Sequence, residues 1–239
     1  NEDAPRIHTH IAVRAGSKHD PADATGLAHY LEHMLFKGTS RFGTTDWEKE
    51  KPLLDRISEL YELRRATTDE TKRDSLYALI DSVSNQAARI AIPSEYDKMI
   101  SSLGARRTNA YTSLEQTVYI NDIPSDEMER WMRIESERFQ DLVLRLFHTE
   151  LETVYEEFNM GQDDDRRHAS KELMAALFPD HPYGTQTTIG TGEHLKNPSM
   201  VKIHEYFLKC YVPNNMAVIM CGDLDYDRTI ALLDQYFGK

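Results

Sequence analysis

The sequence has little cysteine, little positive charge and no long apolar run. Its only cysteines, Cys210 and Cys221, exclude a structural zinc site with four Cys and His ligands, and the two can either pair or remain thiols. No apolar run approaches the roughly 20 residues that span a bilayer, so we expect no membrane-spanning helix and no membrane as a partner. The 28 Lys and Arg residues form no cluster, and the net charge of −12 argues against nucleic acid or anionic membranes as partners.

One apolar segment, residues 26–36, contains only three strongly polar side chains, which are His29, Glu32 and His33. At about 100° per residue, these three share one narrow stripe of a helix that is otherwise apolar. Histidines four positions apart can each give a nitrogen to the same ion, and the intervening glutamate can act as a general base. The order H-x-x-E-H is a zinc hydrolase motif, the reverse of H-E-x-x-H.

The alternative is a surface helix that exposes one polar stripe to water. Surface helices usually carry Lys, Arg and Glu over half of their circumference, whereas residues 26–36 contain no charge besides that stripe. The metal site is therefore the favoured interpretation. A catalytic zinc ion needs three protein ligands and one open position, so a further ligand must come from elsewhere in the chain.

A second amphipathic helix, predicted over residues 147–158, offers two candidates for that ligand. Its apolar stripe consists of Phe147, Leu151, Val154 and Phe158. Glu150 and Glu157 are seven positions apart and border this stripe. A carboxylate that faces the interior is costly unless a cation pairs with it. Both residues also fit as ordinary boundary glutamates, and the periodicity does not rank them.

Several motifs occur together along the chain. They are Ala15-Gly16-Ser17, residues 25–39 (TGLAHYLEHMLFKGT), residues 109–113 (NAYTS) with Thr117 and Tyr119, the pair Glu150 and Glu157, and residues 211–216 (YVPNNM) before Gly222-Asp223. In combination they resemble the pitrilysin family of zinc metallopeptidases, which includes insulin-degrading enzyme and mitochondrial processing peptidase. The resemblance covers nearly the whole chain.

The resemblance implies a role for each polar residue of the two helices. His29, His33 and Glu157 would bind one zinc ion, Glu32 would be the general base, and Glu150 would support the site from behind the ligands. The implied activity is that of a zinc-dependent endopeptidase that hydrolyses peptides or unfolded polypeptides with metal-activated water. The alternative is a non-catalytic family subunit with a role in assembly or peptide binding, but such subunits usually lose ligands.

Asn109 and Ala110 fall where the family presents an edge strand beside the metal. The resemblance implies that the substrate peptide pairs with this strand as an added β-strand. A turn or bulge at Asn109 also fits its local sequence.

The pattern of elements predicts an α+β fold, in which helices cover one side of an antiparallel β-sheet, as in a processing-peptidase-like metallohydrolase domain. The predicted strands are residues 6–14, 107–113, 116–122 and 216–221, the last of them buried. The further predicted helices are residues 93–103, 126–141 with Ser125 as N-cap, 166–177, 199–210 and 227–236.

His33 and Glu157 are 124 positions apart, which is several tens more than the family usually has between these ligands. Residues 45–91 are highly charged and contain two sets of apolar residues with helical spacing. Residues 67–70 (TTDE) between the two sets form a capping-box pattern. We therefore expect an inserted αα-hairpin over residues 45–91 within a single domain of residues 1–239.

The chain starts inside the first strand region of the family, so we expect a fragment of a larger protein. Family members resemble a clamshell built from several copies of this fold. The resemblance thus implies that further domains, or a partner subunit, complete a chamber around the peptide substrate. We expect a soluble chain, and it shows no targeting signal that would identify its compartment.

Overall fold

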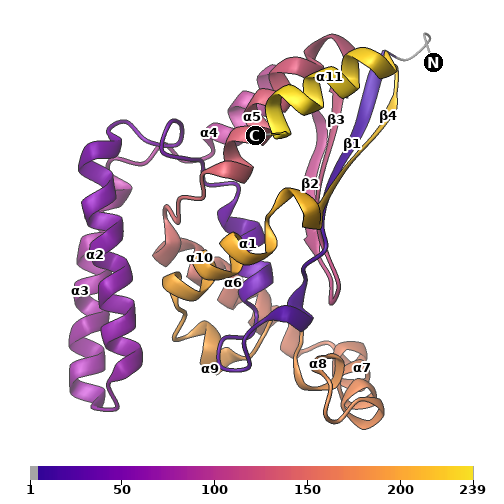
Figure 1. Ribbon diagram of the computed structural model, residues 1–239. Coiled ribbons are helices and arrows are strands. Elements are labelled where there is room, and N and C mark those ends of the chain that lie inside the picture. The colour runs from indigo at the N-terminus through magenta and orange to yellow at the C-terminus, as the bar shows by residue number, and fades with distance from the viewer. Residues whose placement is uncertain (1–4, 239) are drawn as a thin grey trace.

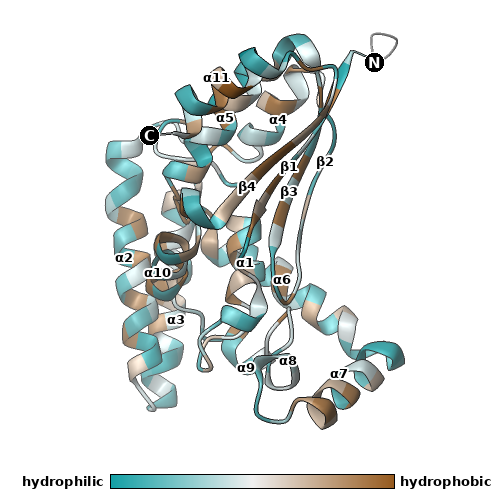
Figure 2. Ribbon diagram, turned by 45° about the vertical axis from the view of Figure 1, so that its right-hand side comes forward, coloured by the Kyte–Doolittle hydropathy of each residue, from teal (hydrophilic) through white to brown (hydrophobic). Residues whose placement is uncertain are grey.

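The computed structural model describes residues 5–238, whose strands form one antiparallel sheet in the order β2-β3-β1-β4 (Figure 1). The strands are β1 (Arg6–Val13), β2 (Arg106–Thr112), β3 (Thr117–Pro124) and β4 (Met216–Gly222). Side chains alternate along β1, with Ile7, Thr9, Ile11 and Val13 on the buried face. Helices α1 (Leu27–Met34) and α5 (Met128–Gln140) contact the sheet and share one apolar core with that face, and Figure 2 shows the sheet beside the helices. The predicted fold class is therefore confirmed.

Seven of the helices outside residues 45–91 lie close to their predicted positions, whereas the short helices α8 (Pro182–Thr185) and α9 (Gly192–Leu195) stand where the sequence predicts none. The seven are α1 (Leu27–Met34), α4 (Glu95–Ser102), α5 (Met128–Gln140), α6 (Phe147–Gln162), α7 (Asp165–Leu177), α10 (Met200–Cys210) and α11 (Tyr226–Phe237). Short 3-10 turns span Ser17–His19, Ser125–Glu127 and Pro213–Asn215.

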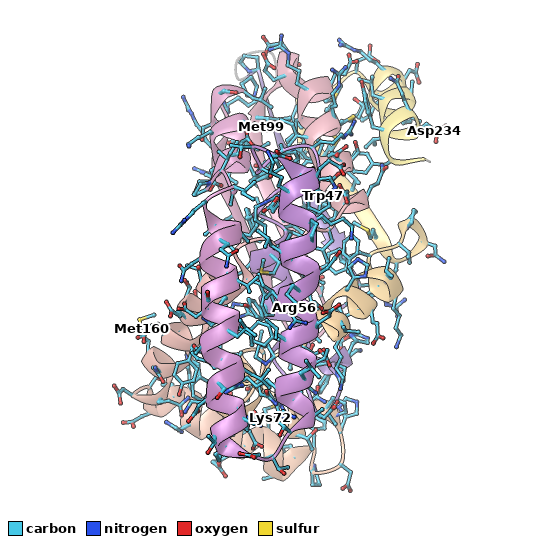
Figure 3. All side chains as sticks on the ribbon, turned by 90° about the vertical axis from the view of Figure 1, so that its left-hand side faces the viewer. Trp47, Arg56, Lys72, Met99, Met160 and Asp234 are labelled. Atoms are coloured by element: carbon cyan, nitrogen blue, oxygen red, sulfur yellow. The ribbon has the colours of Figure 1, made fainter. Side chains whose placement is uncertain are left out.

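Helices α2 (Trp47–Ala66) and α3 (Glu70–Ala88) pack side by side as a helical hairpin within residues 45–91. Asp69 caps α3 by accepting a hydrogen bond from the backbone N–H of Lys72 at 3.2 Å. Figure 3 views the hairpin from outside, where the exposed side chains of Arg56 and Lys72 project from it. These charges form a solvated surface.

A buried ion pair ties the hairpin to the rest of the domain. The guanidinium of Arg145, just before α6, donates to both carboxylate oxygens of Glu50 on α2, at 2.7 and 2.8 Å. Arg145 also donates to the backbone oxygens of Lys37, Thr39 and Phe42 in the loop after α1. One buried cation therefore joins α2, the end of α1 and the start of α6.

Two details differ from the prediction. Strand β4 is half exposed rather than buried, with Ile219 53% exposed, because β4 is an edge strand and the face that carries Ile219 is open. Residues 125–127 form a 3-10 turn before α5, so Glu127 rather than Ser125 is the N-cap of that helix, and the hydroxyl of Ser125 donates to Asp223 at 2.9 Å. The thiols are free, that of Cys210 buried and that of Cys221 exposed.

Candidate metal centre

Helix α1 carries His29, Glu32 and His33 on one side, and its N-terminus is held by a side chain that the sequence reasoning missed. Asp20, 5% exposed, accepts hydrogen bonds from the backbone N–H groups of Gly26 at 2.8 Å and Ala28 at 2.9 Å. Burial raises the pKa of Asp20 to about 7, although the backbone donors oppose this rise. Capping rules consider the residue directly before a helix, and Asp20 lies several residues earlier, so no local signal identifies it.

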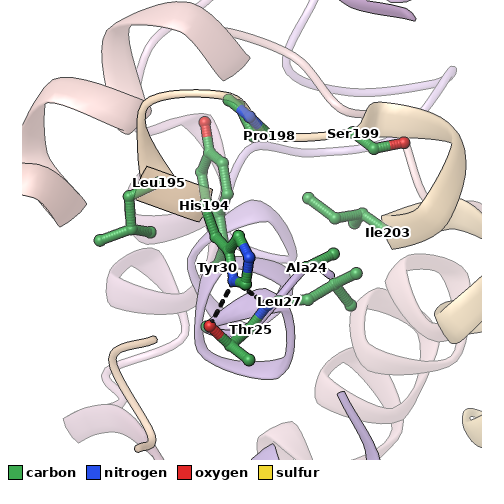
Figure 4. Close-up of a pocket in the computed structure, with 10 residues that line it drawn as sticks. Ala24, Thr25, Leu27, Tyr30, His194, Leu195, Pro198, Ser199 and Ile203 are labelled. Atoms are coloured by element: carbon green, nitrogen blue, oxygen red, sulfur yellow. Dashed lines mark hydrogen bonds between the residues drawn. The ribbon is translucent and has the colours of Figure 1, made fainter. Parts of the chain in front are cut away.

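The loop before α9 packs against the same end of α1. Gly26 has a φ of +84°, and a Cβ at this position would lie 2.5 Å from the backbone oxygen of Ile189. His194 accepts a hydrogen bond from the backbone N–H of Thr25, as Figure 4 shows. The adjacent cavity measures about 20 Å³, which is room for about one water molecule and far too small for a peptide.

Replacing Asp20 with alanine is expected to lower the free energy of unfolding by about 1–3 kcal/mol, because two buried N–H donors lose their acceptor. Zinc affinity should fall with it, since these donors set where α1 begins. Asp23→Ala is the matched control, because Asp23 is exposed and forms only surface ion pairs with Lys202 and Arg65. Chemical denaturation and zinc competition measure both effects. Equal losses in the two variants would contradict the capping role.

Three side chains from α1 and α6 bring their ligand atoms together. Nε2 of His29 lies 3.5 Å from Oε2 of Glu157, and Nε2 of His33 lies 3.8 Å from the same oxygen. The three ligand atoms all lie within 4.8 Å of one another. Ligand atoms around a tetrahedral zinc ion are about 3.3 Å apart, given bonds of about 2.0–2.1 Å. The arrangement therefore fits zinc with only small side-chain movements.

Glu150 lies behind His33 rather than beside the ligand nitrogens. Its Oε1 is 2.8 Å from Nδ1 of His33, and its Oε2 pairs with the ammonium group of Lys37. A carboxylate in this position fixes the orientation of an imidazole whose other nitrogen faces a metal. Lys37, which the sequence reasoning did not single out, follows α1 and compensates the charge of this buried carboxylate.

Burial and neighbouring charges give the two histidines different pKa values. Burial, with a contribution from His33, lowers the pKa of His29 to about 4, so this ring is neutral at pH 7. Burial also lowers the pKa of His33, but the hydrogen bond and charge of Glu150 outweigh it and the net shift is upward. For Glu150, burial raises the pKa, and contacts with His33 and Lys37 produce a net decrease.

Glu32 faces the sheet from the same helix. Its side chain is largely buried, and the hydroxyl of Thr112 on β2 donates to its Oε2 at 2.5 Å. Burial raises the pKa of Glu32, while the Thr112 hydrogen bond opposes the rise. The carboxylate is therefore held between α1 and the edge of the sheet.

Strand β2 forms one edge of the sheet and packs against α1. Asn109 pairs with Ile120 and is exposed, whereas Ala110 pairs with Tyr119 and is half-buried. The register of β2 against β3 shifts between Arg106 and Asn109, so Asn109 lies in the strand directly after an irregularity. The other long edge of β2 has no strand partner within residues 5–238.

No helix within the same range combines the length and the apolar composition that a membrane span requires.

Two sequence profiles of one peptidase family match the chain. The sequence profile of the insulinase family, peptidase family M16, matches residues 1–51 and 85–191. A profile described as the peptidase M16 inactive domain matches residues 200–239. The gap in the first match, residues 52–84, lies within the hairpin of α2 and α3.

Curated relatives align with nearly the whole chain. An uncharacterized zinc protease of Mycobacterium leprae (strain TN) is 27% identical over 231 residues, which are 96% of this chain and 40% of the relative. The beta subunit of mitochondrial-processing peptidase from Neurospora crassa is 21% identical over 229 residues, which are 95% of this chain and 37% of the relative. The chain thus spans about two fifths of the length of these relatives.

Solved structures share the fold. A protease from Helicobacter pylori superposes with a TM-score of 0.73 at 20% identity, over 98% of this chain and 45% of that one. The first half of the periplasmic protease PqqL from Escherichia coli gives a TM-score of 0.71 at 19% identity, over 98% of this chain and 41% of that one. With the family profile matching well over half of its residues, the chain belongs to the insulinase family of peptidases, family M16.

Proposed function

We propose that this chain is the zinc-binding domain of an endopeptidase that hydrolyses peptides or unfolded polypeptides. The observation that carries the proposal is the convergence of His29, His33 and Glu157 on one point, with Glu32 on the same side of α1. Several curated relatives are named as zinc proteases, and these names support the proposal. A non-catalytic subunit is the second candidate, because one of the two matching profiles is that of an inactive domain.

In the proposed reaction, His29, His33 and Glu157 would hold one zinc ion. Bound zinc would supply Lewis acidity, polarising the scissile carbonyl and lowering the pKa of the attacking water. The carboxylate of Glu32 accepts the proton of that water and passes it to the leaving amine. Thr112 keeps Glu32 oriented through its hydrogen bond, and Glu150 keeps the ring of His33 in position.

The substrate would bind along β2. Its unpaired backbone groups offer hydrogen bonds to an extended peptide, which would lie beside α1 with Asn109 and Ala110 as its nearest partners. Such pairing uses the peptide backbone and therefore accepts varied side chains. An extended polypeptide segment fits this edge.

We further propose that residues 1–239 act as a single domain that needs additional domains, or a partner subunit, to work. The curated relatives are more than twice as long as this chain. With β2 and the metal ligands on one side only, a peptide would meet open water on the other side. Positioning and exclusion of water would both be incomplete.

The chain alone, loaded with zinc, is therefore expected to bind the metal but to hydrolyse unstructured peptides poorly. A library of unstructured peptides, assayed with the chain and with its longer parent protein, tests this expectation. Hydrolysis by the parent that a chelator abolishes and zinc restores would support the peptidase. No hydrolysis by the zinc-loaded parent would favour the non-catalytic subunit, and equal turnover by the chain alone would contradict the need for further domains.

A further inference from the structure

The outer face of the sheet carries two histidines that the metal centre does not use. His8 and His10 are two positions apart on β1, so their side chains project from the same face, opposite the buried row that contains Ile7. His8 is exposed and His10 is half-buried. An ion in solvent can therefore reach this pair.

The two imidazole rings converge. Nε2 of His8 lies 2.9 Å from Nε2 of His10, and the ring centroids are 4.8 Å apart at an angle of 68°. Two nitrogen ligands of one tetrahedral zinc ion are about 3.3 Å apart, so a small opening of the pair would let both bind the same ion. Burial and the neighbouring His8 lower the pKa of His10, which favours the neutral form that binds metals.

The neighbouring strands place two further ligand types beside His8. It pairs directly with Cys221 on β4 and with Asp122 on β3, and such pairs project from one face with Cβ atoms about 4.5–5.5 Å apart. Asp122 is already engaged, since Nε of Arg6 donates to its Oδ1 at 2.5 Å. Cys221 has a free, exposed thiol, and sulfur is a ligand that zinc accepts readily.

We propose that His8, His10 and Cys221 form a second transition-metal site, for zinc or a similarly soft divalent ion. The ligand atoms of these three residues are not all within 4.8 Å of one another in the structure, so the site requires the Cys221 side chain to rotate toward the histidine pair, and binding would release the thiol proton to solvent. The donor set is two nitrogens and one sulfur, whereas the centre between α1 and α6 offers two nitrogens and one carboxylate oxygen. The two sites share no residue.

Cobalt(II) distinguishes the sites, because a thiolate ligand gives an intense sulfur-to-cobalt charge-transfer band in the near ultraviolet. The metal-free chain is expected to bind two equivalents of cobalt in a titration. The thiolate band should account for only one of these two equivalents. Cys221→Ser should abolish the band and reduce the capacity to one equivalent. The double variant His8→Gln with His10→Gln should have the same effect.

Cys210→Ser is the matched control, because Cys210 is a buried thiol away from the histidine pair, and it should keep the band and both equivalents. Far-ultraviolet circular dichroism verifies that each variant is folded. Absence of the thiolate band from the wild-type chain, or a band that persists in Cys221→Ser, would overturn the proposal, whereas a single equivalent that carries the band would count only against the centre between α1 and α6. Chelator-sensitive hydrolysis by the parent protein should be unchanged in the double histidine variant, which separates this site from the proposed peptidase centre.

Discussion

Replacing Glu32 with glutamine is expected to lower peptide hydrolysis by the parent protein by about 10²–10⁴-fold, the usual contribution of a general base. The amide keeps the size of the side chain and can still accept the hydrogen bond of Thr112, but it cannot take up the proton of the attacking water. Zinc should remain bound, because Glu32 is no ligand in the proposed centre. Steady-state kinetics and metal analysis of the same preparation measure the two effects.

His33→Ala is the comparison for this prediction, because it removes a proposed ligand rather than the proposed base. It should lose both zinc and activity. Equal loss of zinc in Glu32→Gln and His33→Ala would show that Glu32 is itself a ligand. Full activity in Glu32→Gln would mean that another group accepts the proton.

The second prediction ranks the two glutamates of α6, Glu150 and Glu157, by their contribution to zinc affinity. Glu157→Gln should weaken zinc binding much more than Glu150→Gln, because only Glu157 lies beside the Nε2 atoms of both histidines. Loss of an orienting carboxylate typically costs about 10–100-fold in metal affinity, and loss of a ligand costs more. Zinc affinity measured by competition with a chelating dye ranks the variants.

Glu156→Gln serves as the control for both substitutions, since Glu156 lies on the same helix, outside the cluster of ligand atoms. Its zinc affinity should match that of the wild type. If the Glu150→Gln variant binds zinc more weakly than the Glu157→Gln variant, the ligand is Glu150. The match of this helix to the family motif would then be out of register by two helical turns.

Much of the fold follows from local patterns. The alternation of apolar residues along β1 and the spacing of the two apolar sets in residues 45–91 depend only on the periods of strand and helix. The capping pattern at residues 67–70 likewise belongs to one turn of chain. The strand and the two helices appear in the structure, but the N-cap of α3 is Asp69 rather than the Thr67 of the predicted capping box. The prediction that β4 is buried is wrong, because an apolar strand has the same composition at the edge of a sheet as in its centre.

The sequence by itself determined that His29, Glu32 and His33 share one helix face, and that Glu150 and Glu157 border another. Helical periodicity fixes the face on which a side chain lies, but not what lies opposite. Only the tertiary structure decided that Glu157 meets both histidine Nε2 atoms while Glu150 contacts His33 Nδ1.

The same limit applies to the residues around the centre. Asp20, Lys37 and Thr112 each contact the α1 region or its partners through side chains that no sequence period connects to the motif. The pairing of His8 with Cys221 spans more than two hundred residues of chain. Such contacts depend on how separate elements pack, and packing is set by the whole core rather than by any local segment.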